Sequence, residues 1–392
     1  MNPAPATGAP ETGNLRKPMR TPILALLGAG LVMAVPALAC TDVRIMASDG
    51  SAFSVRTMEF AEDLKSDAVI VPRGQKASSA APKGDGLGWT SKYGFVGVNA
   101  FDEPFFTDGL NEKGLGLGAL YLPGETEYQT VKTGEESRAL ANTDFAAWVL
   151  GNFSTVEEVR KALSNVVVWG PTVPQLGSFS PLHYVVTEPS GKSIVVEYVG
   201  GKLQVYDNEV GVLTNSPAYP WHIQNLRNYV NLTAVNAAPV KVGNTTYAGT
   251  GQGSGLHGLP GDPTPPSRFV MAAATSYLAD KPKDANDALV LAMHLIDRVD
   301  IPKGLVRDYT NGGKPMGDYT QWTAFRDHAN KVYYWRSYAD PALKAIDLKT
   351  VDFTAGQPVR SIAVGGGKPT VEMLSPDQLA ATQSSYRPTS GR

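Results

Sequence analysis

The sequence predicts an α+β fold in which two β-sheets pack face to face and helices lie outside them. Strand-like runs of alternating apolar and polar residues occur in clusters, and pairs of helical segments separate these clusters. Gly and Pro are frequent, at 40 and 29 of the 392 residues, which suits many short strands and turns better than a helical bundle. Residues 40–392 are predicted to form a single domain.

The first two strands are predicted to form a hairpin. Residues 41–47 alternate apolar and polar side chains, Asp49-Gly50 supplies a turn, and residues 52–57 run back. Asp-Gly between two alternating runs is a strong hairpin signal. The hairpin would bring Arg56 back beside Cys40. Further strands are predicted at residues 94–100, 115–121, 182–187, 193–198, 202–206, 210–213, 322–326 and 331–336.

Helical patterns form two pairs along the chain. Ser154 and Glu157, three residues apart, predict a capping box at the start of the second helix. Residues 239–266 are rich in Gly, Pro and Thr and are predicted to form a long surface loop. The four helices are predicted at residues 143–152, 154–165, 267–278 and 285–298.

The charge balance and the cysteine content exclude some classes of protein. The formal net charge is −2, which gives no electrostatic reason to expect nucleic acid or an anionic membrane as a partner. The single cysteine, Cys40, cannot form an internal disulfide. This cysteine is therefore reactive, lipidated, a ligand or merely buried, and its position in the chain decides among these.

Residues 1–39 have the order of a secretory signal peptide. Arg16, Lys17 and Arg20 form a basic cluster, an apolar run covers residues 23–35, and the small-residue pattern Ala-Leu-Ala covers residues 37–39. The apolar run is too short for a helix that spans a bilayer, which needs about 20 residues. We expect an exported, periplasmic or secreted protein of Gram-negative type, with no stable membrane insertion after cleavage. Translation from Met19 instead of Met1 would give a more typical signal peptide.

Cleavage after Ala39 would leave Cys40 at the new N-terminus, where two classes of exported protein carry a cysteine. In a lipoprotein this thiol is lipidated, and leucine is usual three residues before it, where this chain has Ala37. In the other class the cysteine is a nucleophile. A lipid-anchored binding protein therefore stays the alternative to an enzyme, and an inert cysteine near a different cleavage site is a third interpretation.

An N-terminal cysteine carries its own base. The α-amine has an ordinary pKa of about 7.7–8.0 and the thiol about 8.5, so the two groups can exchange a proton directly or through one water. No histidine is then required as a base. The five histidines do not show the sequence spacing that is typical of metal ligands, so we predict no metal site. We assign surface or structural roles to His183, His222, His257, His294 and His328.

Five motifs follow one another from Cys40 nearly to the end of the chain. They are Cys40-Thr41 with residues 55–60, Asp108-Gly-Leu-Asn-Glu-Lys-Gly-Leu-Gly116 with residues 120–124, residues 212–217, residues 258–262 with 267–269, and residues 318–320. In this order they resemble the choloylglycine hydrolases and penicillin V acylases. The resemblance implies an αββα sandwich of the N-terminal-nucleophile hydrolase type, hydrolysis of a linear amide without a cofactor, and a homotetramer.

The resemblance also implies a role for each residue near the N-terminus. Cys40 would be the nucleophile and its amine the base. Arg56 would lie by the thiolate and favour it through its charge. Glu59 stands where the family usually has an aspartate that holds the terminal ammonium, and it is one methylene longer. Outside this context, Arg56 is an ordinary strand arginine paired with Glu59 or Glu62, and Asp42 is either a strand residue or a hydrogen-bond partner near the site.

Three later residues match the family's site in the same way. Asn215 would be the side-chain donor of an oxyanion hole, the backbone N–H of Tyr121 would be the second donor, and Arg268 would be the second arginine. The plainer interpretations are a turn residue before Ser216-Pro217 for Asn215, a strand aromatic for Tyr121 and a helix-start arginine for Arg268.

The resemblance leaves the substrate open among conjugated bile salts, penicillin V-type penicillins and N-acyl homoserine lactones. Tyr121 resembles the penicillin V acylases, because bile salt hydrolases often carry asparagine there. An aromatic set either lines an apolar acyl pocket or belongs to the core: Trp89, Phe101, Phe105 and Phe106. Besides the amidase and the lipoprotein, a family-like scaffold without activity is a third class.

Overall fold

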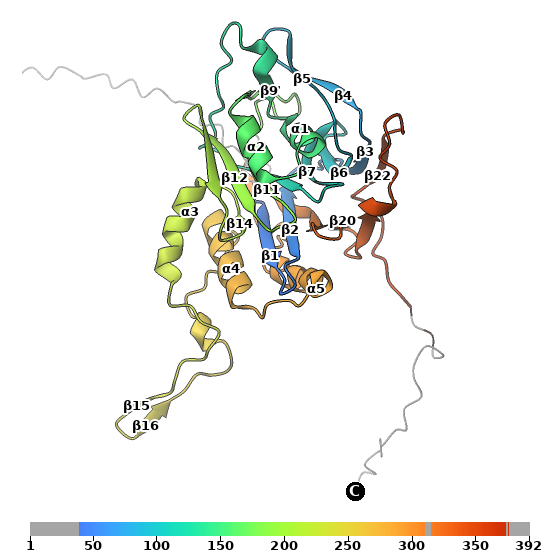
Figure 1. Cartoon of the computed structure of the whole chain (residues 1–392). Helices are drawn as coiled ribbons and strands as arrows, with labels where there is room; N and C mark the ends of the chain where they lie inside the picture. Colours follow the sequence, from blue (N-terminus) through green and yellow to red (C-terminus); the bar gives the residue numbers. More distant parts are fainter. Residues whose placement is uncertain (1–38, 310–314, 374, 376–392) are drawn as a thin grey trace, which may run out of the picture. The chain divides into compact units, whose positions relative to one another are not determined.

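The structure is a computed structural model that describes residues 39–309, 315–373 and 375 (Figure 1). All these residues belong to one compact unit. The predicted signal peptide, residues 1–39, lies outside the described residues except for Ala39.

Two large antiparallel sheets form the body of the fold. The first has six strands in the order β14 (Val212–Leu213), β1 (Thr41–Met46), β2 (Ala52–Phe60), β19 (Tyr319–Asp327), β20 (Val332–Ser337) and β21 (Lys344–Asp347). The second has eight strands in the order β13 (Lys202–Asp207), β12 (Ser193–Val199), β11 (Leu182–Thr187), β8 (Gly116–Tyr121), β7 (Phe105–Asn111), β6 (Phe95–Ala100), β3 (Asp67–Val71) and β22 (Arg360–Ala363).

Helices cover the outer face of each sheet. Helix α1 (Phe145–Asn152) packs on β7 and β8, and α2 (Val156–Leu163) follows it. Helices α4 (Pro265–Leu278) and α5 (Ala285–Ile296) pack on β1 and β2 of the other sheet. Strands β19 and β20 contact β7, so the two sheets pack on each other. The layers confirm the predicted α+β class and its αββα order.

Strand β2 lies at the centre of the six-stranded sheet, and all nine of its residues are buried. Successive side chains of a strand point to opposite faces. Arg56 and Phe60 therefore contact the eight-stranded sheet, through Ala119 and Tyr121, respectively. Thr57 and Glu59 lie on the other face, toward the helices. The alternation thus divides the polar residues of β2 between two environments.

The structure differs from the sequence prediction at the helix cap and in the long loop. The capping box lies one residue later than predicted: Thr155 accepts from the Glu158 N–H, and the Glu158 carboxylate accepts from the Thr155 N–H. Thr155 has the extended backbone that a cap requires, so the helix begins at Val156. Residues 239–266 are mostly exposed, as predicted, but contain the hairpin β15 (Val240–Val242) and β16 (Thr245–Tyr247).

Several elements were not predicted at all. They include β3, β7, β21 and β22 of the two sheets and helix α3 (Tyr219–Asn225). The other short strands are β4 (Lys76–Ala80), β5 (Asp85–Thr90), β9 (Ala139–Ala141), β10 (Val167–Trp169), β17 (Asp308–Tyr309) and β18 (Pro315–Met316).

Candidate active site

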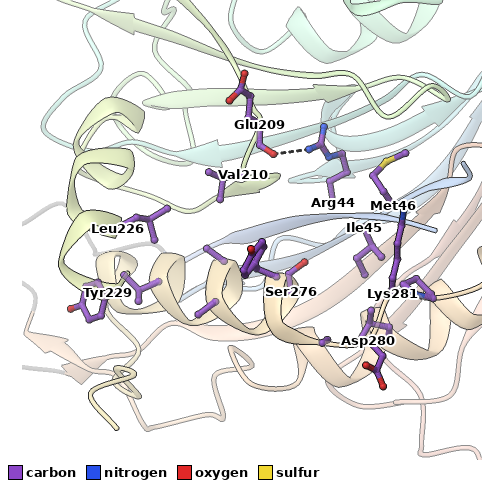
Figure 2. Close-up of a pocket in the computed structure, with 17 residues that line it drawn as sticks. Arg44, Ile45, Met46, Glu209, Val210, Leu226, Tyr229, Ser276, Asp280 and Lys281 are labelled. Carbon is purple, nitrogen blue, oxygen red and sulfur yellow. Dashed lines mark hydrogen bonds between the residues drawn. The ribbon is translucent and has the colours of Figure 1, made fainter. Parts of the chain in front are cut away.

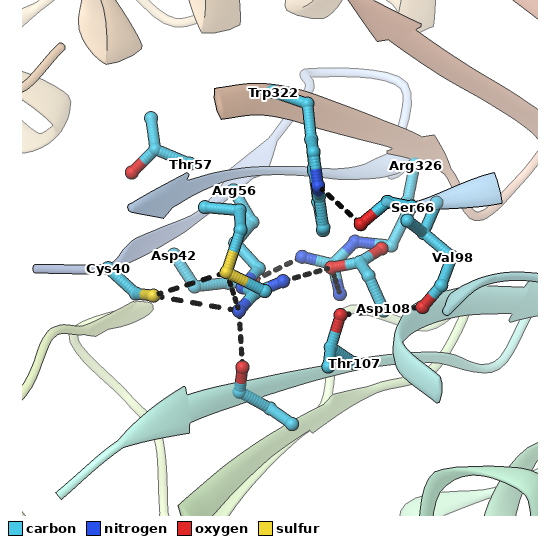
Figure 3. Close-up of polar contacts among 12 residues, drawn as sticks. Cys40, Asp42, Arg56, Thr57, Ser66, Val98, Thr107, Asp108, Trp322 and Arg326 are labelled. Carbon is cyan, nitrogen blue, oxygen red and sulfur yellow. Dashed lines mark hydrogen bonds and ion pairs between the residues drawn. The ribbon is translucent and has the colours of Figure 1, made fainter. Parts of the chain in front are cut away.

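Cys40 lies immediately before β1, in the space between the two sheets. It is free and 1% exposed. Its Sγ is 3.7 Å from Nη2 of Arg56 and 4.0 Å from Sδ of Met58 (Figure 3). Its backbone nitrogen donates to Oδ1 of Asn215 over 2.7 Å. The sulfur therefore faces a cation, and the nitrogen faces an amide oxygen.

The β1–β2 hairpin brings Arg56 to the sulfur. In the register of the hairpin Arg56 pairs with Asp42, which lies two residues after Cys40, so the Arg56 side chain reaches back toward Cys40. Its Nη2 also donates to the carbonyl of Ala119 in β8. Its guanidinium lies over the Trp322 ring, 5.2 Å from the centroid, as a cation–π contact. The hairpin therefore brings Arg56 beside Cys40, as predicted.

Four buried charges form a cluster behind Cys40, which we call the charge cluster: Asp42, Arg56, Asp108 and Arg326 (Figure 3). Oδ2 of Asp108 is 3.7 Å from Nη1 of both Arg56 and Arg326. Arg326 also pairs with Asp42. The Asp108 carboxylate accepts a 2.9 Å hydrogen bond from the Tyr333 hydroxyl at its other oxygen. The cluster joins β1, β2 and β19 of one sheet to β7 of the other.

Gly118 in β8 leaves the space that the charge cluster occupies. A Cβ at this position would lie 3.1 Å from Oδ2 of Asp42 and 3.3 Å from Nη1 of Arg326. A side chain there would therefore displace the charges. Burial raises the pKa of Asp108, and the Arg326 and Arg56 cations act against this.

Glu59 lies on the helix side of β2, where two threonine hydroxyls bind it. Thr320 donates to Oε1 over 2.6 Å, and Thr57 donates to Oε2 over 3.0 Å. Thr320 and Trp322 are two residues apart, a spacing that places side chains on the same face of a regular strand. A β-bulge in β19 between them puts them on opposite faces. Thr320 is opposite Glu59, whereas Trp322 is opposite Met58 and stacks on Arg56.

Burial raises the pKa of the Glu59 carboxyl to about 8, and the Arg268 cation opposes the rise. Burial also raises the pKa of the Cys40 thiol, while Arg56 lowers it. The Glu59 backbone N–H and the Arg268 cation lower it as well, whereas the Glu59 carboxylate raises it. The Arg56 cation thus acts in favour of the thiolate, but burial has the larger effect in the chain that retains Ala39.

Asn215 and Arg268 meet at the backbone of Cys40, Asn215 at its nitrogen and Arg268 at its carbonyl oxygen. Nη2 of Arg268 donates to Oδ1 of Asn215 over 2.7 Å, and Nη1 donates to the carbonyl of Cys40 over 2.5 Å. Nδ2 of Asn215 donates to the carbonyl of Tyr121 over 2.8 Å. An amide NH2 has two hydrogens, and this contact uses one of them. Asn215, Arg268 and Tyr121 thus converge on Cys40 from a loop, a helix and a strand.

Tyr121 ends β8 and begins a series of aromatic contacts. Its ring meets Phe60 edge-on at 6.0 Å, Phe60 meets Phe101 at 6.0 Å, and Phe101 lies 6.5 Å from Phe105. Burial raises the pKa of the Tyr121 phenol. Phe101 and Phe105 line a cavity of about 310 Å³. Trp89 and Phe106 line a different cavity, of about 520 Å³, so the predicted aromatic set divides into two pairs.

Residues 40–360 match the protein family described as linear amide C–N hydrolases, choloylglycine hydrolase family. The chain belongs to the choloylglycine hydrolase family. It is 35% identical over 312 residues to a bile salt hydrolase/transferase of Clostridium perfringens, covering 79% of this chain and 92% of the relative. It is 29% identical over 351 residues to a penicillin V acylase of Pectobacterium atrosepticum, covering 84% and 86%.

Solved structures of choloylglycine hydrolase relatives have the same fold. A variant of conjugated bile acid hydrolase from Clostridium perfringens superposes with a TM-score of 0.75 at 31% identity, covering 86% of this chain and all of that one. Penicillin V acylase from Agrobacterium tumefaciens gives a TM-score of 0.68 at 25% identity, covering 88% and 98%. The predicted N-terminal-nucleophile hydrolase fold and the predicted amidohydrolase class are both confirmed.

All six predicted site residues of this choloylglycine hydrolase lie together, but the sequence did not assign a function to four of their neighbours: Asp108, Thr320, Trp322 and Arg326. Asp108 was part of a motif without a role. Only Arg326 had a signal in the sequence, a charge inside a predicted strand, because Asp108 and Arg326 come together only when the two sheets pack on each other.

Three further properties of the described chain concern metal sites, membrane-spanning helices and other cavities. Within residues 39–309, 315–373 and 375, no three His, Cys, Asp or Glu side chains are grouped so that they hold a metal ion. None of the helices in the described part of the chain is long and apolar enough to cross a membrane. A cavity of about 510 Å³ lies between β1 and α4, and its lining residues, shown in Figure 2, include none of the predicted site residues.

Proposed function

We propose that this protein is an exported amidase that hydrolyses the linear amide of N-acyl substrates with Cys40 as its N-terminal nucleophile. The observation that carries the proposal is the pair of contacts on Cys40. Its sulfur lies 3.7 Å from the Arg56 guanidinium, and its nitrogen lies 2.7 Å from Oδ1 of Asn215. Removal of residues 1–39 would turn this nitrogen into an amine that serves as the base.

The same contacts support a sequence of steps for the reaction. The amine takes the thiol proton, and the thiolate attacks the amide carbon and forms the C–S bond. The free Nδ2 hydrogen of Asn215 and the Tyr121 N–H stabilise the negative oxygen that forms. The C–N bond then breaks as the ammonium returns its proton to the leaving amine. Water hydrolyses the thioester, which releases the acid and restores the thiol.

The aromatic contacts near Tyr121 support an apolar acyl group in the substrate. Tyr121, Phe60 and Phe101 form a continuous apolar path from the site toward the cavity that Phe101 and Phe105 line. The relatives are named for bile salts, conjugated bile acids and penicillin V. We infer that the substrate is one of three kinds: a conjugated bile salt, a penicillin V-type amide or an N-acyl homoserine lactone.

A substrate panel on the mature enzyme tests this proposal: penicillin V, glycine- and taurine-conjugated bile salts, and acyl homoserine lactones. We expect turnover of at least one amide by the wild type and almost none by Cys40→Ser, with the fold retained. A chain that keeps one residue before Cys40 should be equally inactive, because its nitrogen is an amide. Normal turnover by this blocked chain would exclude the amine as the base.

The lipid-anchored binding protein predicts a different chemical form of the chain. Intact mass separates the two, because lipidation adds diacylglycerol and acyl mass to Cys40, whereas the amidase starts at unmodified Cys40. A scaffold without activity would leave every amide of the panel intact even with a free terminal cysteine. Export and the homotetramer stay predictions, which N-terminal sequencing of the secreted protein and analytical ultracentrifugation test.

A further inference from the structure

Two buried histidines bind the main chain at Asn215. Nε2 of His183, in β11, is 2.8 Å from the carbonyl oxygen of Thr214. Nε2 of His222, in α3, is 2.8 Å from the carbonyl oxygen of Asn215 itself. Both rings are fully buried. A carbonyl oxygen only accepts, so both Nε2 atoms are donors. Two successive carbonyls are thus held from two different elements.

Asn215 needs these contacts because regular structure ends just before it. Strand β14 consists of Val212 and Leu213 alone, and residues 214–218 belong to no helix or strand. Buried backbone carbonyls outside regular structure need partners from side chains or water. The two histidines supply them at Thr214 and at Asn215, and the side chain of Asn215 contacts Cys40.

We propose that His183 and His222, which we call the histidine clamp, are positioning residues that orient the Asn215 amide for catalysis. This inference rests on the proposed function, since it assumes that Asn215 stabilises the oxyanion. Among the described residues, the ring hydrogen bonds of the two histidines go to Glu197 and to the carbonyls of Thr214 and Asn215, not to Cys40 or to the side chain of Asn215. The clamp acts on the backbone, and Arg268 and Tyr121 bind the side chain.

Each histidine is itself fixed on its far side. Nδ1 of His183 lies 2.9 Å from Oε1 of Glu197, and the same oxygen accepts a 2.9 Å hydrogen bond from the Tyr219 N–H at the start of α3. Glu197 therefore connects His183 to the helix that carries His222. The buried carboxylate gives the imidazole one orientation, as carboxylates do for functional histidines elsewhere.

The ring of His222 stacks on Phe269 at 4.6 Å with an interplanar angle of 11°. Phe269 follows Arg268 in α4, so neighbouring residues of one helix hold the side chain and, through His222, the main chain of Asn215. Burial lowers the pKa of His222 to about 4, which keeps the ring neutral at neutral pH. His222 thus adds no charge to the site.

Variants of His222 test the clamp in the mature enzyme, with kcat normalised to titrated Cys40 thiol. We expect His222→Ala to lower kcat at least about 10-fold while KM changes less than about 2-fold, because an oxyanion donor acts mainly on the transition state. His222→Gln, which keeps an N–H donor, should recover most of kcat. His183→Ala should behave like His222→Ala.

His328→Ala is the matched control. His328 is equally buried, and its ring bonds the Gly114 carbonyl and the Ser54 hydroxyl, each at 2.8 Å, away from Asn215. The His328→Ala substitution should lower the stability of the enzyme and leave kcat per titrated thiol unchanged. Wild-type kcat in His222→Ala, or an equal loss in His328→Ala, would overturn the clamp.

A second readout separates this inference from the proposed function. If no amide of the panel is hydrolysed by the wild type, the proposed function fails. The clamp is then decided by a crystal structure of His222→Ala. We expect the Asn215 amide to lose its contacts with Arg268 and Tyr121, and an Asn215 that retains both contacts would overturn the clamp.

Discussion

Oδ1 of Asn215 accepts a 2.7 Å hydrogen bond from Nη2 of Arg268. The same oxygen accepts from the nitrogen of Cys40, also over 2.7 Å. Because the Arg268 cation binds Oδ1 of Asn215, this oxygen faces Cys40. Nδ2 of Asn215 then lies on the side of Tyr121. Arg268 is therefore placed to set the orientation of the predicted oxyanion donor without contacting the sulfur.

Replacing Arg268 with lysine tests this relationship. Arg268 uses its whole guanidinium: Nε donates to the carbonyl of Pro263 over 2.9 Å, Nη1 to the carbonyl of Cys40, and Nη2 to Asn215. A lysine keeps the charge but has no planar fork, so we expect kcat/KM to fall by about 10–100-fold.

Arg160→Lys is the control for the lysine replacement, because Arg160 pairs with Asp207 at the surface. Its activity should equal that of the wild type. An Arg268→Lys enzyme as active as Arg160→Lys would show that charge alone is sufficient at Arg268.

The charge cluster leads to a prediction about stability. In Asp108→Asn the buried Arg56 and Arg326 would lose a shared carboxylate that lies 3.7 Å from each. Removing one member of a buried ion pair typically costs about 3–5 kcal/mol, because the remaining charge stays buried. We expect urea denaturation to report a loss of this size in the free energy of unfolding.

Asp207→Asn removes a charge from an exposed pair with Arg160, where Asp207 is 75% exposed. Its free energy of unfolding should stay within about 0.5 kcal/mol of the wild type. If Asp108→Asn were as stable as Asp207→Asn, the cluster would make no net electrostatic contribution to stability.

The parts of the site that the sequence predicted are those set by local geometry or by motifs. Asp49-Gly50 specifies a two-strand hairpin, and hairpin register alone places Arg56 opposite Asp42 and near Cys40. Residues 40–60 therefore contained the information for the sulfur–guanidinium contact.

The missed residues depend on contacts between strands that are far apart in the chain. Strand β7, Phe105–Asn111, is buried on both faces, so it has no period of two and was not predicted. Asp108 in that strand reaches Arg326 only because the two sheets pack together. The bulge between Thr320 and Trp322 leaves no mark in the sequence either, although it determines which face each side chain joins.

Glu59 should make the stability of the uncleaved chain fall as pH rises. Its pKa in the folded chain is about 8 against an ordinary value of 4.5. A carboxyl whose pKa is raised by folding contributes stability that is fully present below pH 4.5, its pKa in the unfolded chain. This contribution is lost as pH rises from 4.5 to 8, at up to about 1.4 kcal/mol per pH unit. The difference in stability between Glu59→Gln and the wild type should follow that slope. A difference that is constant from pH 4.5 to 8 would contradict a neutral, buried Glu59.

Two buried histidines should act with the opposite pH dependence. Burial lowers the pKa of His222 to about 4 and that of His328 to about 3, against an ordinary 6.5. Above pH 6.5 both the folded and the unfolded chain carry neutral rings, so no stability is lost. As pH falls from 6.5 toward 4, the unfolded chain takes up protons that the folded chain does not. Each histidine should then lower the free energy of unfolding by up to about 1.4 kcal/mol per pH unit.

Urea denaturation of the wild type and His328→Gln at pH 7.5, 6.5, 5.5 and 4.5 measures the contribution of one of these rings. Glutamine does not titrate, so the stability curve of His328→Gln should be less steep than that of the wild type between pH 6.5 and 4.5, and parallel to it above pH 6.5. The comparison cancels the opposite contribution of Glu59, which both chains share and whose hydrogen-bond partners, Thr57 and Thr320, are not those of His328. Parallel curves over the whole range would mean that His328 takes up its proton in the folded chain as readily as in the unfolded one.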